Sequence, residues 1–267
     1  MANSLGSFTG SIPEAYDQFN FPVNIKPFAV EMGARLDLSV SHRVLETAAG
    51  TGVATRCMMS GLPEVYWLVT DISEGMLKIA EANAGGREKT DFQVMDACEL
   101  TVENESFDAL VSLFGYMFYL DQPAALKEAY RALKKGGKLH MAVWDELETS
   151  PFTAEVTEIL SPVLGEQVPS FLVQAHHSHD KDKIKTQLAL AGFRDIKIDT
   201  VAIEMEPVSP ENLANAFAQG TPIAMELLKK DRQPNEVAVW LGDQLGQKFG
   251  PLIKGIKRQA IYIEAYK

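Results

Sequence analysis

The stretch VLETAAGTG, residues 44–52, passes from apolar residues to an acid and then continues almost without side chains. Its acid is Glu46, and it ends in Gly50, Thr51 and Gly52. Small residues let a ligand lie against bare backbone, and glycine adopts backbone angles that other residues avoid. The carboxylate of Glu46 adds a charged acceptor beside such a ligand. We therefore expect a ligand-binding turn at the end of a buried strand.

Strands and helices alternate on the C-terminal side of this turn. Apolar runs and turn residues predict, in order, strand 43–47, helix 53–60, strand 65–70, helix 73–84, strand 91–95, strand 107–113, helix 122–133 and a strand that ends at Trp144. Such alternation predicts a parallel sheet with helices on both faces. Ligands bind to these sheets at the carboxyl ends of the strands, where residues 44–52 are expected to lie.

The flanking segments are less regular. We expect a short helix at 14–21 that Pro22 stops, a second helix at 28–38, loss of regular structure over 146–179, a helix at 181–191, a strand at 193–206, mainly helical structure over 207–250 and a last strand at 258–266. This pattern predicts an N-terminal helical lid over residues 1–40 and a ligand-binding domain over residues 41–267. The domain carries expected helical insertions at about 146–180 and 207–250.

The composition limits the classes of partner. With 267 residues, of which 46% are hydrophobic, the chain can bury a full core. Lys and Arg number 25 against 36 Asp and Glu, which gives a net charge of −11. An acidic surface repels phosphate backbones, so we expect no nucleic-acid partner. The dense basic stretches, 134–135, 181–185 and 254–258, are short and are expected to be solvated.

The sequence also indicates a compartment. No stretch approaches the roughly 18 uncharged apolar residues that a membrane span needs, so we expect no membrane partner. The first residues lack the basic start and apolar run of a signal peptide. Cys57 and Cys98 have no CxxC spacing and suit a reducing environment. We therefore expect a cytoplasmic protein.

Three kinds of ligand commonly bind a glycine-rich turn after the first strand of such a sheet. A phosphate-binding loop needs Lys and then Ser or Thr after its last glycine, and Val53 and Ala54 stand there. A dinucleotide turn needs Gly or Ala three places after Gly52, where Thr55 stands, and Glu46 would then lie near two phosphates. S-adenosylmethionine carries an amine, a sulfonium and a ribose but no phosphate, so an acid beside the turn suits it best.

Two further acids follow the next strands. Asp71 ends the second predicted strand, where a carboxylate accepts hydrogen bonds from both ribose hydroxyls in sheets of this type. Asp96 and Ala97 follow the third strand. A carboxylate there accepts from the adenine amino group, and a neighbouring backbone N–H donates to a ring nitrogen. Ile72 is placed to cover the adenine face.

These stretches resemble the class I S-adenosylmethionine-dependent methyltransferases, of the small-molecule kind called methyltransferase type 11 or ubiquinone-biosynthesis-like. The family's motifs are matched in turn by residues 46–52, by Asp71 in VTDISEGMLKIA, by the pair Asp96-Ala97, by FDALVSLFG and by LKKGGKL. Ala48 stands at the first glycine of the first motif, and Lys135 at the usual proline of the last. The resemblance covers residues 43–145. It implies a Rossmann-like, doubly wound α/β fold with a seven-stranded sheet, mostly parallel with an antiparallel last strand.

The resemblance also implies a set of cofactor-binding residues. Backbone groups at the end of the fourth strand would meet the methionine amine, and Tyr16 matches a family position that closes over the cofactor. The full set is Tyr16, Glu46, Ala48, Gly50, Gly52, Asp71, Ile72, Met76, Asp96, Ala97, Ser112 and Leu113.

Candidate acceptor-site residues lie in two segments. The aromatic run FGYMFYLD follows the fourth strand, where the family's loop borders the acceptor, and Tyr116 is a candidate for orienting it. The run HHSHD occupies residues 176–180, in a part of the chain where the family often has an acceptor-contacting loop, so His176 and His177 are candidate bases. We expect no metal site there, because no further ligands stand at a supporting spacing. His140 falls in a predicted buried strand and is expected to be a core residue.

The sequence thus predicts methyl transfer from S-adenosylmethionine to a small organic acceptor, aromatic or otherwise apolar, with O-methylation ahead of C- and N-methylation. Two alternatives stay open. The first is a protein of this fold that binds the cofactor without transferring methyl and uses the pocket for cyclisation or regulation. The second is an RNA or protein methyltransferase. The helical segment at 207–250 is a candidate cap on the acceptor pocket or a candidate face of a homodimer.

Overall fold

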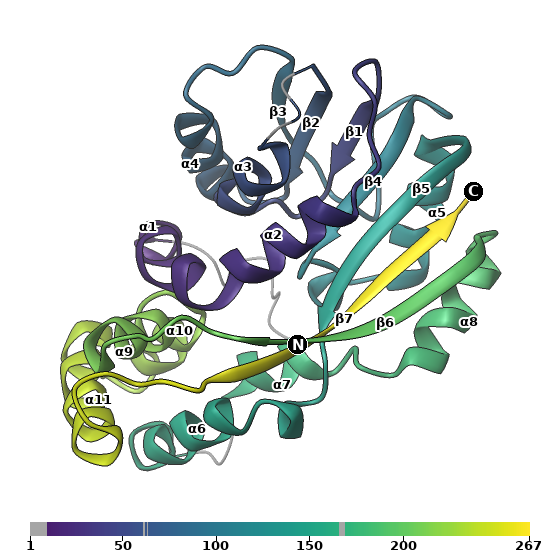
Figure 1. Ribbon diagram of the computed structural model, residues 1–267. Helices are drawn as coiled ribbons and strands as arrows, with labels where there is room; N and C mark the ends of the chain where they lie inside the picture. The colour runs from purple at the N-terminus through teal and green to yellow at the C-terminus, as the bar shows by residue number, and fades with distance from the viewer. Residues whose placement is uncertain (1–9, 61, 63, 166–168) are drawn as a thin grey trace.

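The strands of the molecule form one sheet, in the order β3-β2-β1-β4-β5-β7-β6 (Figure 1). The computed structural model describes residues 10–60, 62, 64–165 and 169–267. The strands are β1 (Arg43–Glu46), β2 (Tyr66–Asp71), β3 (Thr90–Val94), β4 (Phe107–Leu113), β5 (Leu133–Trp144), β6 (Arg194–Glu204) and β7 (Lys257–Tyr266). Strands β1 to β5 pair in parallel, and β7 runs antiparallel to β5 and to β6. The predicted doubly wound sheet with an antiparallel last strand is confirmed.

The central strands owe their place to apolar residues on both faces. In β1, β2 and β4 almost every residue is buried, as in parallel strands that helices cover on two sides. The edge strand β6 instead alternates between exposed and half-buried residues. The core therefore lies on both sides of β1, β4 and β5, beneath the carboxyl ends that form the site.

Besides α2 (Lys26–Arg35), whose Phe28 carbonyl accepts a hydrogen bond from the Tyr262 hydroxyl of β7, four helices cover the two faces of the sheet, and their ends follow capping rules. They are α3 (Val53–Met59), α4 (Glu74–Ala84), α5 (Gln122–Ala132) and α8 (Lys181–Ala191). The Ser73 hydroxyl accepts a hydrogen bond from the Met76 N–H at 3.3 Å, and Gly85 ends the same helix in the left-handed conformation. Asp121 caps α5 in the same manner. The predicted start and end of α4 are confirmed.

The N-terminal helix is longer than predicted. One helical run comprises α1 (Ile12–Ala15), the π-helical segment η2 (Tyr16–Ile25) and α2 (Lys26–Arg35), with Pro22 inside it. The expectation that Pro22 stops a helix at residue 21 is wrong. The wide π turn accommodates the proline ring, and the Lys26 N–H reaches the Phe21 carbonyl five residues earlier. Residues 1–9 of the expected lid lie outside the described part of the chain.

Two groups of helices interrupt the alternation of strands. After β5 come η4 (Leu147–Thr149), α6 (Pro151–Leu164) and α7 (Ser170–His176), and after β6 come α9 (Pro210–Ala218), α10 (Ile223–Leu228) and α11 (Pro234–Phe249). Regular structure was expected to fall off over 146–179, and this is wrong, because Pro151 begins a helix at its first position and does not break one. Figure 1 shows α6, α9, α10 and α11 together beyond one end of the sheet, next to α1.

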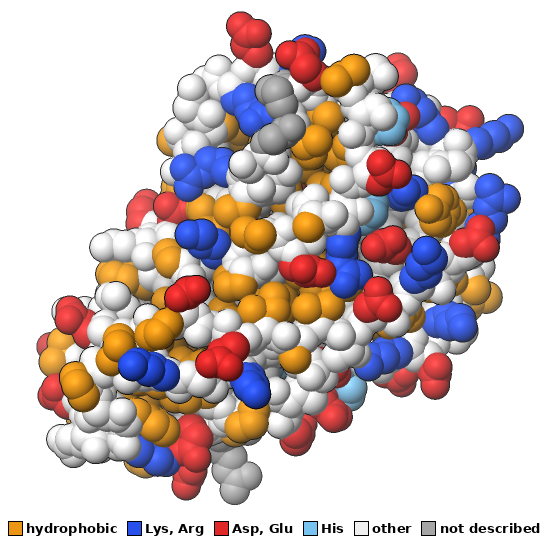
Figure 2. Space-filling view, viewed as in Figure 1, with side chains coloured by type: hydrophobic (Ala, Val, Ile, Leu, Met, Phe, Trp, Pro, Cys, Tyr) orange, Lys and Arg blue, Asp and Glu red, His pale blue; other side chains and the backbone are white. Residues whose placement is uncertain are grey.

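The face in Figure 2 carries interspersed acidic and basic side chains over β5, β6 and α8, and apolar side chains show across the middle of the face and at the helical end. None of the helices formed by the described residues is long and apolar enough to span a bilayer.

Candidate functional site

A crevice of about 200 Å³ opens where the parallel strands end. Its floor is made by the residues that follow β1, β2, β3 and β4, together with Trp144 at the end of β5. Segment η2 and the ends of α7 and α9 form the opposite wall. The crevice lies at the carboxyl ends of the strands, where the sequence predicts the site.

One carboxylate holds the turn that follows β1. The Gly50 N–H donates to Asp71 Oδ2 at 2.8 Å, and the Ser73 N–H donates to Asp71 Oδ1 at 2.8 Å. Asp71 therefore ties the end of β2 to the turn before any ligand binds. Each of its oxygens keeps a second lone pair for a ligand donor. Burial raises the pKa of Asp71, and the backbone donors oppose that shift.

The glycines of this turn have different roles. A methyl group built on Gly50, which has φ of +60°, would meet nothing within 4 Å, so this glycine leaves open space in the crevice. A methyl group on Gly52 would lie 2.7 Å from Ala80 Cβ in α4. Gly52 is not among the residues that line the crevice. Its structural role is the close approach of α3 to α4, which was not anticipated when Gly52 was assigned to cofactor contact.

Ala48 adopts the left-handed conformation, with φ of +54°, which is uncommon for a residue with a side chain. Its methyl group occupies space that a side chain at Gly115 would need, since a Cβ there would stand 2.5 Å from Ala48 Cβ. Ala48 and Gly115 are therefore a complementary pair across the ends of β1 and β4.

Glu46 is a buried acid with an unsatisfied oxygen. Glu46 is 1% exposed, and its Oε2 atom has no hydrogen-bond partner in the described part of the protein. Burial raises the pKa of Glu46 to about 8; the Thr55 hydroxyl opposes this shift and the negative charge of Asp71 adds to it. A carboxyl group in this state is neutral at pH 7 and ionises when a cation enters the crevice.

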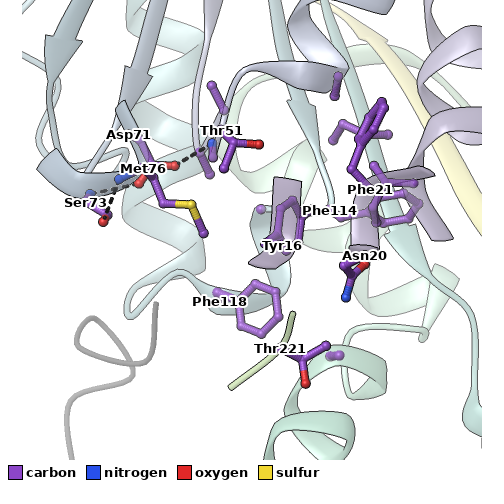
Figure 3. A pocket seen from close by; sticks show the side chains of 18 of the residues that line it. Tyr16, Asn20, Phe21, Thr51, Asp71, Ser73, Met76, Phe114, Phe118 and Thr221 are labelled. Carbon is purple, nitrogen blue, oxygen red and sulfur yellow. Dashed lines mark hydrogen bonds between the residues drawn. The ribbon is translucent and has the colours of Figure 1, made fainter. Parts of the chain in front are cut away.

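Residues after β2 and β3 form one end of the crevice, and we call this end, together with the turn after β1, the cofactor half because the sequence predicts cofactor contacts there. Ile72 is 39% exposed and borders the crevice together with Met76, Asp96 and Ala97. Asp96 Oδ1 accepts the Cys98 N–H at 2.8 Å, which fixes this short turn. Figure 3 shows Asp71, Ser73 and Met76 at one end of the cavity, with Tyr16 and Phe114 farther along it.

Segment η2 supplies polar and aromatic side chains to the wall. Tyr16, Asn20 and Asn24 border the crevice, and burial raises the pKa of Tyr16 above its ordinary value. Asn20 Nδ2 donates to the Gly220 carbonyl at 3.2 Å, which connects η2 to the end of α9. The N-terminal helix is thus held over the crevice by a contact to a residue 200 positions later in the chain.

The half of the crevice beyond β4 and β5 is aromatic. The rings of Phe114 and Trp144 stack at 3.8 Å between centroids, and those of Phe118 and Phe171 stack at 5.7 Å. His176, near the end of α7, faces the same space. This half suits an apolar molecule with a few polar groups.

His176 presents one free acceptor nitrogen. Its Nδ1 lies 2.6 Å from the Asp145 carbonyl oxygen, and because a carbonyl only accepts, Nδ1 carries the proton. Nε2 is then the acceptor, and it is buried without a partner within the described residues. Burial lowers the pKa of His176 to about 4, and the nearby Arg258 charge adds to this effect. The ring is therefore neutral at pH 7, and Nε2 offers a lone pair to a hydrogen-bond donor.

Several predicted site residues lie elsewhere. Tyr116 is buried under the crevice floor and donates its hydroxyl to Gln187 at 2.8 Å. His177 is exposed, with Nδ1 at 2.6 Å from the Gln174 carbonyl. Ser112 bonds the Tyr119 hydroxyl at 2.9 Å beneath the floor. The side chains of Tyr116, His177 and Ser112 therefore do not line the crevice, whereas the end of β4 and the residues after it border the crevice at Leu113, Phe114 and Gly115.

The other predicted residues do line the crevice: Tyr16, Glu46, Ala48, Gly50, Asp71, Ile72, Met76, Asp96, Ala97, Leu113 and His176. Among the side chains that the structure describes, no three of His, Cys, Asp and Glu gather as metal ligands would.

Sequence reasoning missed Arg258. The stretch 254–258 was expected to be a solvated basic patch, but Arg258 is 6% exposed and borders the crevice. The sequence does contain an indication of this burial. Arg258, Ala260 and Tyr262 are alternate residues of β7 and so point to the same face, and these three residues are buried. Asn20 and Asn24 were also missed, since spacing alone does not distinguish them from surface residues.

Comparison with known proteins adds relatives to this geometry. A family model described as a methyltransferase domain matches residues 44–137. The demethylmenaquinone methyltransferase of Renibacterium salmoninarum is 32% identical over 165 residues, which cover 58% of this chain and 68% of that protein. The ubiquinone/menaquinone biosynthesis C-methyltransferase UbiE of Methylobacterium nodulans is 38% identical over 99 residues, 36% of this chain and 39% of that protein. The match spans about two fifths of the first curated relatives.

Solved structures share the fold. Phosphoethanolamine N-methyltransferase 2 of Haemonchus contortus, in complex with S-adenosyl-L-methionine, superposes with a TM-score of 0.61 at 19% identity. The match covers 99% of this chain and 60% of that protein.

Proposed function

The chain belongs to the class I S-adenosylmethionine-dependent methyltransferases, and we propose that it transfers a methyl group to a carbon atom of a small, largely apolar acceptor that carries an acidic hydroxyl group. The relative from Methylobacterium nodulans is named a C-methyltransferase. The sequence-based preference for O-methylation finds no support among the relatives, and we replace it with C-methylation.

S-adenosylmethionine is the cofactor of this family, and the residues of the crevice fit it. The unsatisfied Glu46 Oε2 suits a ligand with a sulfonium and an ammonium group. Asp71 has lone pairs left for the ribose hydroxyls, and Gly50 leaves the backbone bare. The phosphates of a dinucleotide would be repelled by the Asp71 carboxylate and would keep the buried Glu46 in its neutral form. These acceptor groups therefore favour a cationic nucleoside without phosphate.

The cofactor, when bound, supplies an electrophilic methyl group on a positively charged sulfur. The residues of the chain align the reactants and exclude water. The stacked rings of Phe114 and Trp144 form an apolar wall for the acceptor. His176 Nε2 accepts the proton of the acceptor hydroxyl, and the Asp145 carbonyl keeps the imidazole in the required tautomer. Loss of this proton makes the neighbouring carbon more nucleophilic.

The unpartnered Nε2 of His176 carries this proposal. A buried imidazole nitrogen without a partner is costly, so a site that retains one favours a ligand with a donor group. An acceptor whose nucleophilic atom already has a free lone pair would not need a base such as His176 Nε2. The apolar wall and the acidic composition favour a small molecule over RNA.

A comparison of His176→Ala with His177→Ala tests the proposed base. His177 is exposed beside His176 and serves as the matched control. With a panel of phenols, naphthols and 1,3-dicarbonyl compounds, we expect His176→Ala to lower kcat by about 10²- to 10⁴-fold. Cofactor affinity, measured by calorimetry, should change by less than about threefold in both variants, because His176 lies outside the cofactor half. Equal activity of the two variants would remove His176 from the mechanism.

The same panel separates the alternatives. Cofactor that binds to the unmodified protein and is never converted to S-adenosylhomocysteine would favour a binding protein that does not transfer methyl. Methylation of RNA or protein substrates in the absence of small-molecule turnover would favour the other alternative. Mass spectrometry of the methylated product identifies the atom, and an O-methyl product would refute the proposed C-methylation.

A further inference from the structure

Arg258, near the start of β7, is a buried cation on the wall of the crevice. Its Nη1 donates to Asn24 Oδ1, and the guanidinium lies 4.5 Å from the ring centroid of Trp144. Its Nε is buried without a partner among the described residues. Burial lowers the pKa of Arg258 to about 10, so the group stays charged at pH 7.

No carboxylate balances this charge in the part of the chain that the structure describes, since Arg258 forms no ion pair with Asp or Glu there. Arg35 on α2 is a useful contrast. It also stacks on an aromatic ring, at 4.7 Å from the Tyr262 centroid, but it pairs with Glu31 at 2.9 Å and Asp199 at 3.1 Å. A buried charge without a counterion is costly, and a site that keeps one is expected to receive the counterion from a ligand.

The position of Arg258 separates it from the cofactor half. Asp71 ends β2, and the sheet order places β1, β4 and β5 between β2 and β7. Four strand spacings of about 4.8 Å put the two strands about 19 Å apart. Arg258 instead shares the far half with Trp144 and His176, where we have placed the acceptor.

A short chain of buried amides holds the guanidinium there. Asn24 accepts from Arg258 and donates to Asn20 Oδ1 at 3.4 Å, and Asn20 donates to the Gly220 carbonyl. These contacts link η2, α9 and β7, so the guanidinium is positioned before a ligand arrives. Preorganised donors of this kind suit specific recognition of an anion.

We propose that the acceptor carries a carboxylate, which pairs with Arg258 while the apolar part of the molecule lies along Phe114 and Trp144. This inference rests on the proposed methyl transfer and names its substrate class: an amphiphilic hydroxycarboxylate. The planar guanidinium matches the two oxygens of a carboxylate. A single cation balances one negative charge, so a carboxylate fits better than a phosphate dianion, which would leave a second buried charge.

Binding to the protein saturated with S-adenosylhomocysteine tests the inference without turnover. Calorimetry compares each carboxylate with its neutral amide: benzoate with benzamide, cinnamate with cinnamamide, and 4-hydroxybenzoate with 4-hydroxybenzamide. Loss of one partner of a buried charge pair is expected to cost about 30-fold or more in affinity. We therefore expect at least one acid to bind about 30-fold more tightly than its amide, with the difference abolished in Arg258→Met and retained in Arg35→Met.

Three results would overturn the inference. The first is equal or weaker binding of every acid relative to its amide in the unmodified protein, a comparison that requires no variant to fold. The second is acid selectivity that persists in Arg258→Met. The third is loss of S-adenosylhomocysteine affinity in both Arg258→Met and Arg258→Lys, which would assign Arg258 to the carboxylate of the cofactor. Failure of the proposed function shows separately, as absence of cofactor binding or of methyl transfer to every acceptor tested, acidic and neutral alike.

Discussion

The buried acid Glu46 predicts that the cofactor binds more tightly as the pH rises. Its pKa is raised to about 8 by burial, whereas a cationic cofactor requires the ionised form. At pH 7 only about one eleventh of a group with this pKa is ionised, so the apparent Kd is about 11-fold weaker than at high pH. The affinity should therefore increase about 9-fold between pH 6 and pH 7 and about 5-fold between pH 7 and pH 8.

Calorimetric titration of S-adenosylmethionine between pH 6 and pH 8 measures this slope. Glu46→Gln is the matched variant, because it keeps the size of the side chain and stays neutral at every pH. The amino group of the cofactor also titrates, but its contribution is the same in both proteins and cancels in the comparison. Titrations at pH 7 in buffers of different ionisation enthalpy should show release of nearly one proton from the unmodified protein and less from Glu46→Gln.

Parallel slopes in the two proteins would refute this account of Glu46, and so would tighter binding at pH 6 than at pH 8. A second measurement needs no cofactor. Since the pKa of Glu46 is higher in the folded than in the unfolded chain, its protonation stabilises the fold at low pH, and this contribution is lost as the pH rises from about 4.5 towards 8. Between pH 4.5 and pH 7 the loss is about 3 kcal/mol, and Glu46→Gln should not show it.

Other perturbations test other parts of the site. Asp71→Asn should lower the free energy of unfolding by about 2–4 kcal/mol even without cofactor, because its oxygens hold the Gly50 and Ser73 N–H groups; unchanged denaturant midpoints would contradict this. Gly115→Ala should cost about 1–3 kcal/mol through its clash with Ala48, and adding Ala48→Gly should restore much of the loss, so additive effects in the double variant would argue against the pairing. His140 and His176 are buried with pKa values lowered to about 4, so each should lose about 3 kcal/mol of stabilisation as the pH falls from 6.5 to 4, in the direction opposite to Glu46. The free energy of unfolding, measured against pH for the unmodified protein and for His140→Gln, isolates the His140 contribution as the difference between the two curves. Superimposable curves would refute it.

The residue pattern alone predicted the parallel sheet and most of the proposed cofactor half, and the family resemblance implied the antiparallel last strand. These features depend on short stretches whose conformation requires particular residues. The turn after β1 needs small residues, and the acids Glu46 and Asp71 stand where their strands end. Because the carboxyl ends of parallel strands meet at one edge of the sheet, residues that are local in sequence converge there without further information.

The two missed structural features have a local origin as well. Pro22 was expected to stop a helix and regular structure was expected to be lost over 146–179, but a π turn accommodates Pro22 and Pro151 occupies the first position of α6. For Gly52 the sequence motif predicted that a glycine is required but not why. In the structure, a side chain at this position would clash with Ala80.

Only the tertiary structure decided the acceptor half. Asn24 and Arg258 are separated by 234 residues and meet through a hydrogen bond between η2 and β7. His176 and His177 are neighbours in sequence, yet one is buried in the crevice and the other is exposed. Whether Arg258 is buried, and whether it has a counterion among the described residues, depends on the residues packed around it. The sequence near Arg258 indicates neither property. The physical reason is that the proposed cofactor contacts come from turns with local conformational requirements, whereas the proposed acceptor contacts come from side chains that long-range packing brings together.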